Sequence, residues 1–215
     1  MGAGRTLMPP GEARKNDALM VYGACRPQPF VMAYVQQRTE VVHGPACRPG
    51  KEIFMQRCSE DGVPVVARRG GGGTVVLSPG MVVPIVVAPR PAGDVRAIYR
   101  LVQGAMREAL WARWNGDIEQ QGISDLAVDN TKVGGSSLYL PRSPRLFCYQ
   151  SSLMVSSDRG LIDRYLKHPP REPDYRRRRP HSTFCTTLRE VGCPLSTADI
   201  ADIFNSSLPG LLRSA

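Results

Sequence analysis

The sequence lacks the side-chain spacings of a structural metal site. It has only three histidines, and its six cysteines show no paired spacing and no ligand-spaced cluster with histidine or carboxylate; they are Cys25, Cys47, Cys58, Cys148, Cys185 and Cys193. Structural zinc sites need such clusters of thiolate and imidazole ligands. We therefore predict no structural zinc, and we interpret the cysteines as small apolar residues that stay reduced in a cytoplasmic protein.

Long apolar runs are missing as well. No segment has the length of a membrane-spanning helix, and residues 1–17 lack the apolar centre of a signal peptide. A chain of 215 residues with 42% apolar side chains is the right size for one substantial core. These features predict one cytoplasmic domain, residues 17–215, after a flexible leader of residues 1–16, with no membrane partner.

Positive charge is abundant, with a net charge of +9, and part of it lies in one short segment. Arg176 to Arg179 form a run of arginines among the prolines of residues 169–180. This composition favours a solvated basic loop; an acidic protein partner, ATP phosphates or nucleic acid are the functional alternatives. No aromatic stacking platform and no recognised DNA- or RNA-binding motif accompanies the charge, so we predict no nucleic-acid partner.

Apolar periodicity predicts an α+β fold with a mixed, largely antiparallel sheet flanked by helices. Behind Asp94, a good N-cap, apolar residues from Ile98 to Leu110 repeat at helical spacing and predict a helix. Strands are predicted at residues 30–35, 40–43, 63–68, 74–77, 81–87, 118–128, 132–140, 145–149 and 152–155, and further helices at 51–60, 158–166 and 196–205. Consecutive strands with short turns indicate antiparallel pairing.

The segment from Arg68 through Gly70, Gly71, Gly72 and Gly73 to Thr74 is typical of an anion-binding loop. Glycine amides approach a ligand with no Cβ in the way, and an arginine can fork onto carboxylate or phosphate oxygens. A P-loop or a dinucleotide fingerprint needs a helix after its last glycine, whereas Thr74 to Leu77 favours a strand. We therefore expect the ligand to meet a sheet, held by Arg68 and the amides of residues 73–76. A flexible glycine hairpin is the alternative.

A second polar turn places a lysine between two predicted strands. Asp125 precedes the turn, and Lys132 leads Gly134, Gly135 and Ser136. A fixed ammonium with glycines beside it can stabilise charge on a phosphate, although most lysines in turns are solvated surface charges. Asp125 orients Lys132, binds Mg²⁺ or simply caps the turn. The hydroxyls of Ser136 and Ser152 contact substrate, or belong to ordinary strand serines.

Together the two loops resemble the lipoate-protein ligase A family of the biotin and lipoate protein ligase superfamily. The family pattern runs Arg-x-Ser-Gly-Gly-Gly-x-Val-x-His, then Asn-Asp-Leu, a short turn and Lys-x-x-Gly-Ser. Arg68, the triplet from Gly71 to Gly73, and Val75 match its first part, and Lys132 falls on the essential lysine. Ser151 to Met154 is similar to the family's Gly-Ser/Thr-Leu-Leu strand, so the resemblance spans residues 31–188.

Three family side chains are replaced in this sequence. Gly70 stands where the family has serine, Leu77 where it has histidine, and Ser124 where it has asparagine. The residues after Leu188 are too few for the C-terminal accessory domain of the longer ligases, so either a partner polypeptide supplies it or this variant acts without it. A glycine loop without the histidine, on a short chain, is similar to lipoate ligase-like proteins associated with bacterial sulfur oxidation.

The resemblance implies an enzyme that activates lipoate or octanoate with ATP and Mg²⁺. The acyl group would pass to a lysine of a lipoyl domain or of a glycine cleavage H-like protein. Lys132 is the implied catalytic residue, and Mg²⁺ would come with ATP. The implied substrate and ATP site consists of Arg68, Gly71, Gly72, Gly73, Thr74, Val75, Val76, Lys132, Gly134, Gly135, Ser136 and Ser152, with Asp125 as a further candidate.

Two other functions stay open from the sequence. Octanoyltransferases of the same superfamily use a cysteine thiolate with the lysine and need no ATP. Cys185 lies near the region where one transferase type has its cysteine, but the Pro-Cys-Gly of that type is missing, and residues 111–125, where the other type has it, contain no cysteine. The missing family histidine also leaves open an inactive acyl-binding scaffold.

Overall fold

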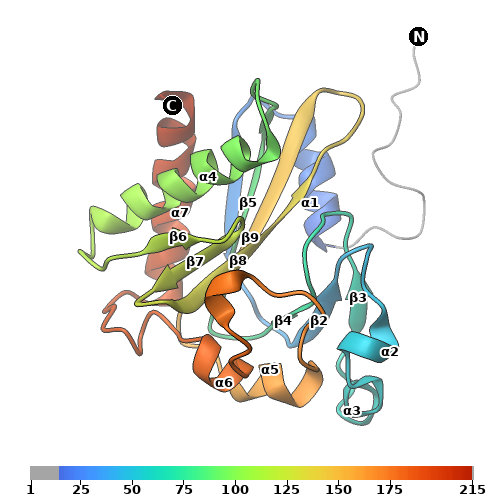
Figure 1. Ribbon diagram of the computed structural model, residues 1–215. Helices are drawn as coiled ribbons and strands as arrows, with labels where there is room; N and C mark the ends of the chain where they lie inside the picture. The colour runs from blue at the N-terminus through green and yellow to red at the C-terminus, as the bar shows by residue number, and fades with distance from the viewer. Residues whose placement is uncertain (1–14, 215) are drawn as a thin grey trace.

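The computed structural model describes residues 15–214, which form two sheets with helices around them (Figure 1). The larger sheet has the strand order β1-β5-β9-β8-β7-β6 with every neighbouring pair antiparallel. Its strands are β1 (Phe30–Val35), β5 (Met81–Pro89), β6 (Glu119–Gln121), β7 (Asp125–Val128), β8 (Thr131–Tyr139) and β9 (Leu146–Met154). The smaller sheet, β3-β2-β4, has one parallel and one antiparallel pair; its strands are β2 (Glu40–His43), β3 (Val65–Ala67) and β4 (Val75–Leu77). The predicted α+β class with a mixed, largely antiparallel sheet is confirmed.

Helices cover both faces of the larger sheet. The long helices α4 (Val95–Trp111) and α7 (Thr197–Ser214) contact each other and cover one face, called here the helix face. On the opposite face, α1 (Lys15–Ala24) packs against β5 and β1. Shorter helices lie near the smaller sheet: α2 (Pro49–Glu52), α3 (Met55–Glu60), α5 (Gly160–Tyr165), α6 (His181–Phe184) and the 3-10 turn η1 (Asp174–Arg176). In residues 15–214, no helix has the length and apolar character to cross a bilayer.

Helix α4 forms as its sequence predicts. The Asp94 carboxylate accepts a hydrogen bond from the Ala97 amide at 2.9 Å and so caps the first turn. Ile98, Val102 and Met106 recur on one face and are buried in the main core with Tyr149, Phe204 and other apolar side chains. This packing fixes the helix face of β8 and β9, and it leaves their other face for the site described below.

Several boundaries differ from the sequence-based expectation. Residues 145–149 and 152–155, predicted as two strands, belong to the single strand β9, and helix 51–60 divides into α2 and α3 because Ile53 between them forms a β-bridge with Leu166. Helix α7 continues past Asn205 to Ser214. The predicted leader lies outside the described residues except for its last two, Lys15 and Asn16, which begin α1.

Candidate active site

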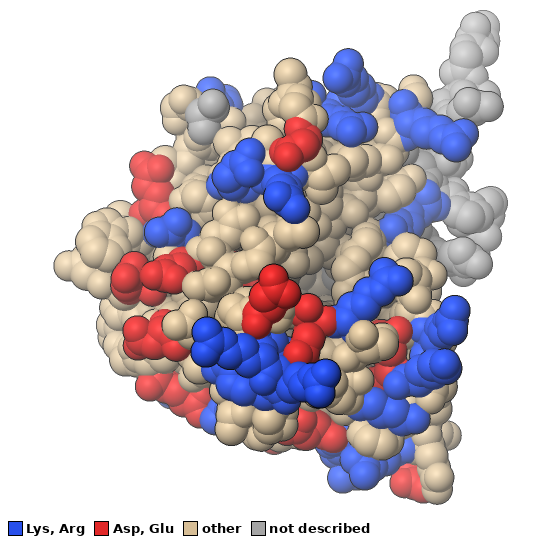
Figure 2. Space-filling view, viewed as in Figure 1, with Lys and Arg blue, Asp and Glu red and all other residues tan. Residues whose placement is uncertain are grey.

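A cavity of about 970 Å³ opens between the exposed face of the larger sheet and the segments that cross in front of it. Its wall is formed by the glycine loop with β4, by β7, β8 and β9, by the first turns of α4, and by residues 169–185. Figure 2 shows acidic side chains near the middle of the viewed face, with basic side chains below and to the right of them. Segments distant in sequence therefore meet at one site.

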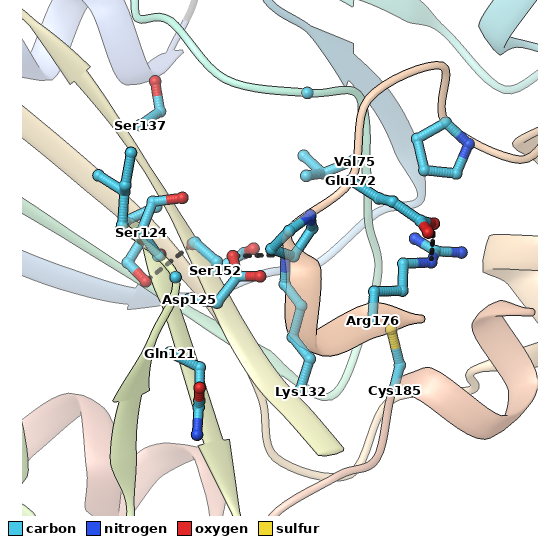
Figure 3. Close-up of a pocket in the computed structure, with 18 of the residues that line it drawn as sticks. Val75, Gln121, Ser124, Asp125, Lys132, Ser137, Ser152, Glu172, Arg176 and Cys185 are labelled. Carbon is cyan, nitrogen blue, oxygen red and sulfur yellow. Dashed lines mark hydrogen bonds and ion pairs between the residues drawn. The ribbon is translucent and has the colours of Figure 1, made fainter. Parts of the chain in front are cut away.

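Lys132 and Asp125 form an ion pair in the cavity wall. Lys132 Nζ lies 2.8 Å from Asp125 Oδ1, and the Tyr175 hydroxyl donates to Oδ2 at 2.9 Å (Figure 3 shows the ion pair). Burial raises the pKa of Tyr175, and the nearby Asp125 carboxylate raises it further. The phenol therefore stays protonated and acts as a donor. Asp125 is thus held at both oxygens. No second acceptor for the Lys132 ammonium occurs among residues 15–214, which leaves N–H groups for a ligand.

A β-bulge turns Lys132 toward the cavity. Ala127 pairs with Lys132 and Leu126 pairs with Gly134, so Val133 is the extra residue on β8. In a regular strand Lys132 and Gly135 would point to opposite faces, whereas across the bulge both lie on the cavity side. A Cβ at Gly135 would lie 2.8 Å from Lys132 Nζ, so the glycine makes room for the lysine side chain.

Arg68 is buried, and its guanidinium binds the glycine loop. Nη2 donates to the carbonyls of Gly71 at 3.0 Å and Gly73 at 2.7 Å, Nη1 to that of Val42 at 3.2 Å, and Nε to Ser137 Oγ at 3.0 Å. Burial lowers its pKa to about 10, which leaves it charged at neutral pH. Within residues 15–214 no ion pair includes Arg68. Its fork therefore shapes the loop, and its uncompensated charge makes the wall attractive to an anion.

The four glycines of the loop serve different purposes. Gly72 has a φ of +101°, a conformation that favours glycine. Gly70 has no such φ, but a Cβ there would overlap Ser137 Oγ. Gly71 and Gly73 have open space where a Cβ would stand, so these positions leave the loop backbone accessible.

Most residues predicted for the site line the cavity. They are Arg68, Gly73, Thr74, Val75, Val76, Asp125, Lys132, Gly135, Ser136 and Ser152, whereas Gly71, Gly72 and Gly134 do not line it. The Ser136 hydroxyl donates to the Ser124 carbonyl at 2.6 Å and accepts from Gln103 Nε2 of α4 at 3.0 Å, so it bonds within the protein. Thr74 Oγ1 donates to Glu52 Oε2 at 2.8 Å. The ligand roles predicted for these hydroxyls stay predictions.

The arginine run is not a uniformly solvated loop: that interpretation was wrong for Arg176, which is buried, and Arg179 is half-buried. Arg176 is only 4% exposed; its Nε donates to the Arg179 carbonyl at 3.0 Å and its guanidinium lies 4.7 Å from the Phe184 ring centre. Arg179 Nη2 donates to the Asn130 carbonyl at 2.7 Å. Contact with an aromatic ring and with a backbone carbonyl explains why Arg176 leaves the solvent. Arg177 and Arg178 are exposed.

Several cavity residues lay outside the sequence-based site, and three of them contact predicted site residues. Tyr175 reaches Asp125 from a segment 50 residues away, and Ser137 reaches Arg68 from 69 residues away, so no local spacing indicates either contact. Cys185 is buried in the wall, where its backbone forms a parallel bridge with Lys132. Burial raises the pKa of the Cys185 thiol, and the Lys132 ammonium acts in the opposite direction.

Leu77, at the position of the family histidine, is 3% exposed and forms part of the apolar cavity wall. It packs in the core cluster that contains Val76, Met81 and Met154. Among the described histidines His181 lines the cavity, and its Nδ1 bonds to Asp163 Oδ1 at 2.8 Å. Among residues 15–214 no group of three or more His, Cys, Asp and Glu side chains is arranged to hold a metal ion.

Comparison with known proteins identifies the family. The family model of the lipoyl protein ligase A/B catalytic domain matches residues 18–208. The chain belongs to this family. Comparison with curated proteins gives no significant match.

Solved structures of lipoate ligases share the fold of this family member. The bipartite lipoate protein ligase of Thermoplasma acidophilum, described with its E2 lipoyl domain, has a TM-score of 0.75 and 15% identity over 91% of this chain and 76% of that chain. A lipoate-protein ligase A bound with ATP has a TM-score of 0.72 and 16% identity over 91% and 78%. P. falciparum LipL1 in complex with lipoate has a TM-score of 0.67 and 17% identity over 86% of this chain and 50% of that chain. At these identities the likeness establishes the fold.

Proposed function

We propose that this family member is an ATP-dependent ligase that activates lipoate or octanoate as an acyl-adenylate and transfers it to a lysine of an acceptor protein. One observation carries the proposal: the Lys132 ammonium is fixed beside Asp125 at 2.8 Å in the same cavity that the glycine loop borders. Solved relatives bound to ATP and to lipoate support the two substrates.

In the first step, a carboxylate oxygen of the acyl substrate attacks the α-phosphorus of ATP, and the bond to the pyrophosphate oxygen breaks. Both reactants are anions, so fixed positive charge lowers the barrier. Lys132 supplies an ammonium with free N–H groups, and the buried Arg68 adds positive potential. Mg²⁺ would be held mainly by the phosphates of ATP and by water.

In the second step, the acceptor lysine amine attacks the acyl carbonyl and AMP leaves, so an amide forms without an enzyme nucleophile. The Lys132 ammonium can stabilise charge first on the α-phosphate and then on the carbonyl oxygen. Asp125, which Tyr175 holds, fixes only the resting position of the ammonium. The apolar wall that includes Leu77, Met81 and Met154 suits a medium-length acyl chain.

The decisive experiment is ATP–pyrophosphate exchange in the presence of lipoate or octanoate, followed by mass spectrometry of a lipoyl domain incubated with both substrates. We expect exchange that depends on the acyl substrate, and an acceptor whose mass increases by one acyl group. If neither substrate supports exchange, the ligase proposal fails, and the transferase and the inactive acyl-binding scaffold are left as alternatives.

A second candidate function is acyl transfer through Cys185. The observation that favours it is the position of Cys185 in the cavity wall beside Lys132, where the Thr186 amide donates to the Lys132 carbonyl at 2.9 Å. The raised pKa of the buried thiol argues against a ready thiolate. A hydroxylamine-labile acyl adduct on Cys185, formed without ATP, would establish the transferase and exclude the ligase.

We also propose that residues 17–215 act as one catalytic domain, and that a lipoyl domain or a glycine cleavage H-like protein is the acceptor. The bipartite ligase of Thermoplasma acidophilum supports a separate polypeptide in the role of the accessory domain. Adding candidate accessory and acceptor proteins to the exchange and mass assays tests both points. The cytoplasmic location and the likeness to proteins associated with sulfur oxidation stay predictions from the sequence.

A further inference from the structure

We propose that Ser137 contacts the acyl substrate directly, by donating its hydroxyl proton to a carboxylate oxygen, and that Arg68 acts on the substrate through this hydroxyl. The inference rests on the proposed function and assigns a residue that the sequence analysis missed. Ser137 lies on β8, is 5% exposed and lines the cavity on the same side as Lys132 and Gly135.

The hydrogen bonds of Ser137 leave its proton free. Its Oγ accepts from Arg68 Nε at 3.0 Å, and no acceptor for the hydroxyl proton occurs among residues 15–214. Gln150 faces it across the strand pair, but Gln150 Oε1 has no hydrogen-bond partner among these residues. A hydroxyl that accepts from a charged guanidinium becomes a stronger donor, because the two hydrogen bonds polarise each other.

The position of Ser137 relative to Lys132 suits a carboxylate. Ser137 is two positions along β8 from Gly135, beside which the Lys132 ammonium lies, and a step of two positions is about 7 Å. A carboxylate that accepts one hydrogen bond at each oxygen can reach two donors up to about 7 Å apart. The substrate carboxylate can therefore lie between Lys132 and Ser137, and Arg68 donates to the Ser137 oxygen (Figure 3 shows Ser137 and Lys132 in the cavity).

Gly70 supports this assignment because its missing side chain makes room for the hydroxyl. A Cβ at Gly70 would overlap Ser137 Oγ, whereas the backbone of Gly70 needs no positive φ. Between the glycine loop and β8, the Ser137 hydroxyl occupies the place where a Cβ of residue 70 would stand. The serine that the related pattern has at position 70 is thus replaced by a serine from the facing strand.

The experiment moves the hydroxyl between the two positions. We expect Ser137→Ala to raise the KM for octanoate and lipoate in pyrophosphate exchange by about tenfold, as for the loss of one charge-assisted hydrogen bond, with the KM for ATP unchanged. Gly70→Ser alone should lose activity through the overlap. The double variant Gly70→Ser with Ser137→Gly should recover the acyl KM to within about threefold of the wild type, whereas Ser137→Gly alone should not.

Matched measurements keep the result interpretable. Ser157→Ala removes another buried serine hydroxyl outside the cavity and should leave both KM values unchanged. Ser137→Cys keeps the size of the side chain, so it separates a lost donor from a lost fold if the alanine variant does not fold. Calorimetric titration with octanoate alone measures the contact without turnover, so it tests Ser137 even if exchange is absent and the proposed function fails. The inference is overturned if Ser137→Cys or Ser137→Ala leaves the acyl affinity unchanged, or if either variant raises the KM for ATP instead. It is also overturned if the double variant is no better than Ser137→Gly.

Discussion

At the scale of single residues, the site depends on one lysine whose charge is balanced in the resting protein. Asp125 neutralises Lys132 at 2.8 Å, so an anionic substrate has to share the ammonium with a carboxylate already in place. Tyr175 draws electron density from the other oxygen of Asp125 by donating to it, which weakens that competition. The lysine is therefore held in position and still available.

Lys132→Ala should lower the rate of acyl-dependent pyrophosphate exchange by about 10²–10³, because one fixed charge at an oxyanionic centre is worth that much. Thermal unfolding should show an intact fold. Lys51→Ala, on exposed α2, is the control and should retain full exchange. Equal exchange by the two variants would remove Lys132 from the mechanism.

Arg68→Lys should lower both stability and acyl affinity. A lysine cannot reach the carbonyls of Val42, Gly71 and Gly73 together with Ser137 Oγ, so about 1–3 kcal/mol of stability should be lost with these buried hydrogen bonds. Urea unfolding measures the first effect and the KM for octanoate measures the second. A variant with wild-type stability would show that the guanidinium does not organise the loop.

At the scale of the elements, the loop that follows α6 keeps Cys185 and its neighbours beside β8. Glu190 accepts from the Thr187 amide at 2.9 Å and from Arg159 Nη2 at 2.8 Å, and Arg159 Nη1 donates to the Cys185 carbonyl at 2.9 Å. These hydrogen bonds outweigh the effect of desolvation, so the pKa of Glu190 falls from its ordinary value near 4.5 to about 2.

Glu190 should therefore contribute a pH-dependent part of the stability. Because its pKa is lower in the folded protein, its contribution is present above pH 4.5 and is lost as the pH falls toward 2. Glu190→Gln should lower the urea midpoint at pH 7 and reduce the further drop between pH 4.5 and pH 2.5. An identical pH profile for the variant and the wild type would contradict this role.

Sequence pattern predicted the elements better than their contacts. The strands around the glycine loop and helix α4 with its Asp94 cap follow from local residue types and spacing. The sequence left three roles open for Asp125, and the structure shows its ion pair with Lys132. The bulge at Val133 does not follow from local pattern, because the alternation of β8 contains no signal for the extra residue. Ser137 and Tyr175 enter the site through tertiary contacts, which periodicity cannot indicate.

At the scale of the whole molecule, only part of the charge of +9 is free to attract a partner. Figure 2 shows basic side chains gathered in front of the segment that precedes α6. Arg176 and Arg179 hold this segment, while Arg177 and Arg178 are exposed. The exposed pair is close to the cavity because neighbouring residues of the same segment line it.

Replacing Arg177 and Arg178 together by serine should raise the KM for an acidic acceptor domain about two- to tenfold and leave adenylation unchanged. Exposed charges act mainly on association, and their effect is screened beyond about 8 Å at physiological ionic strength, so added salt should reduce the difference. The double variant Arg113→Ser with Arg213→Ser removes the same charge from other exposed positions and is the control. Equal loss in both variants would indicate a general charge effect rather than docking.

The shared space between Gly70 and Ser137 also restricts how this site can change over evolutionary time. A serine gained at position 70 is harmful while Ser137 is present, because the two side chains overlap. A lineage can therefore pass from one arrangement to the other only through an intermediate that has neither hydroxyl. The two positions should accordingly vary together among relatives of this chain, with serine at one and a small residue at the other.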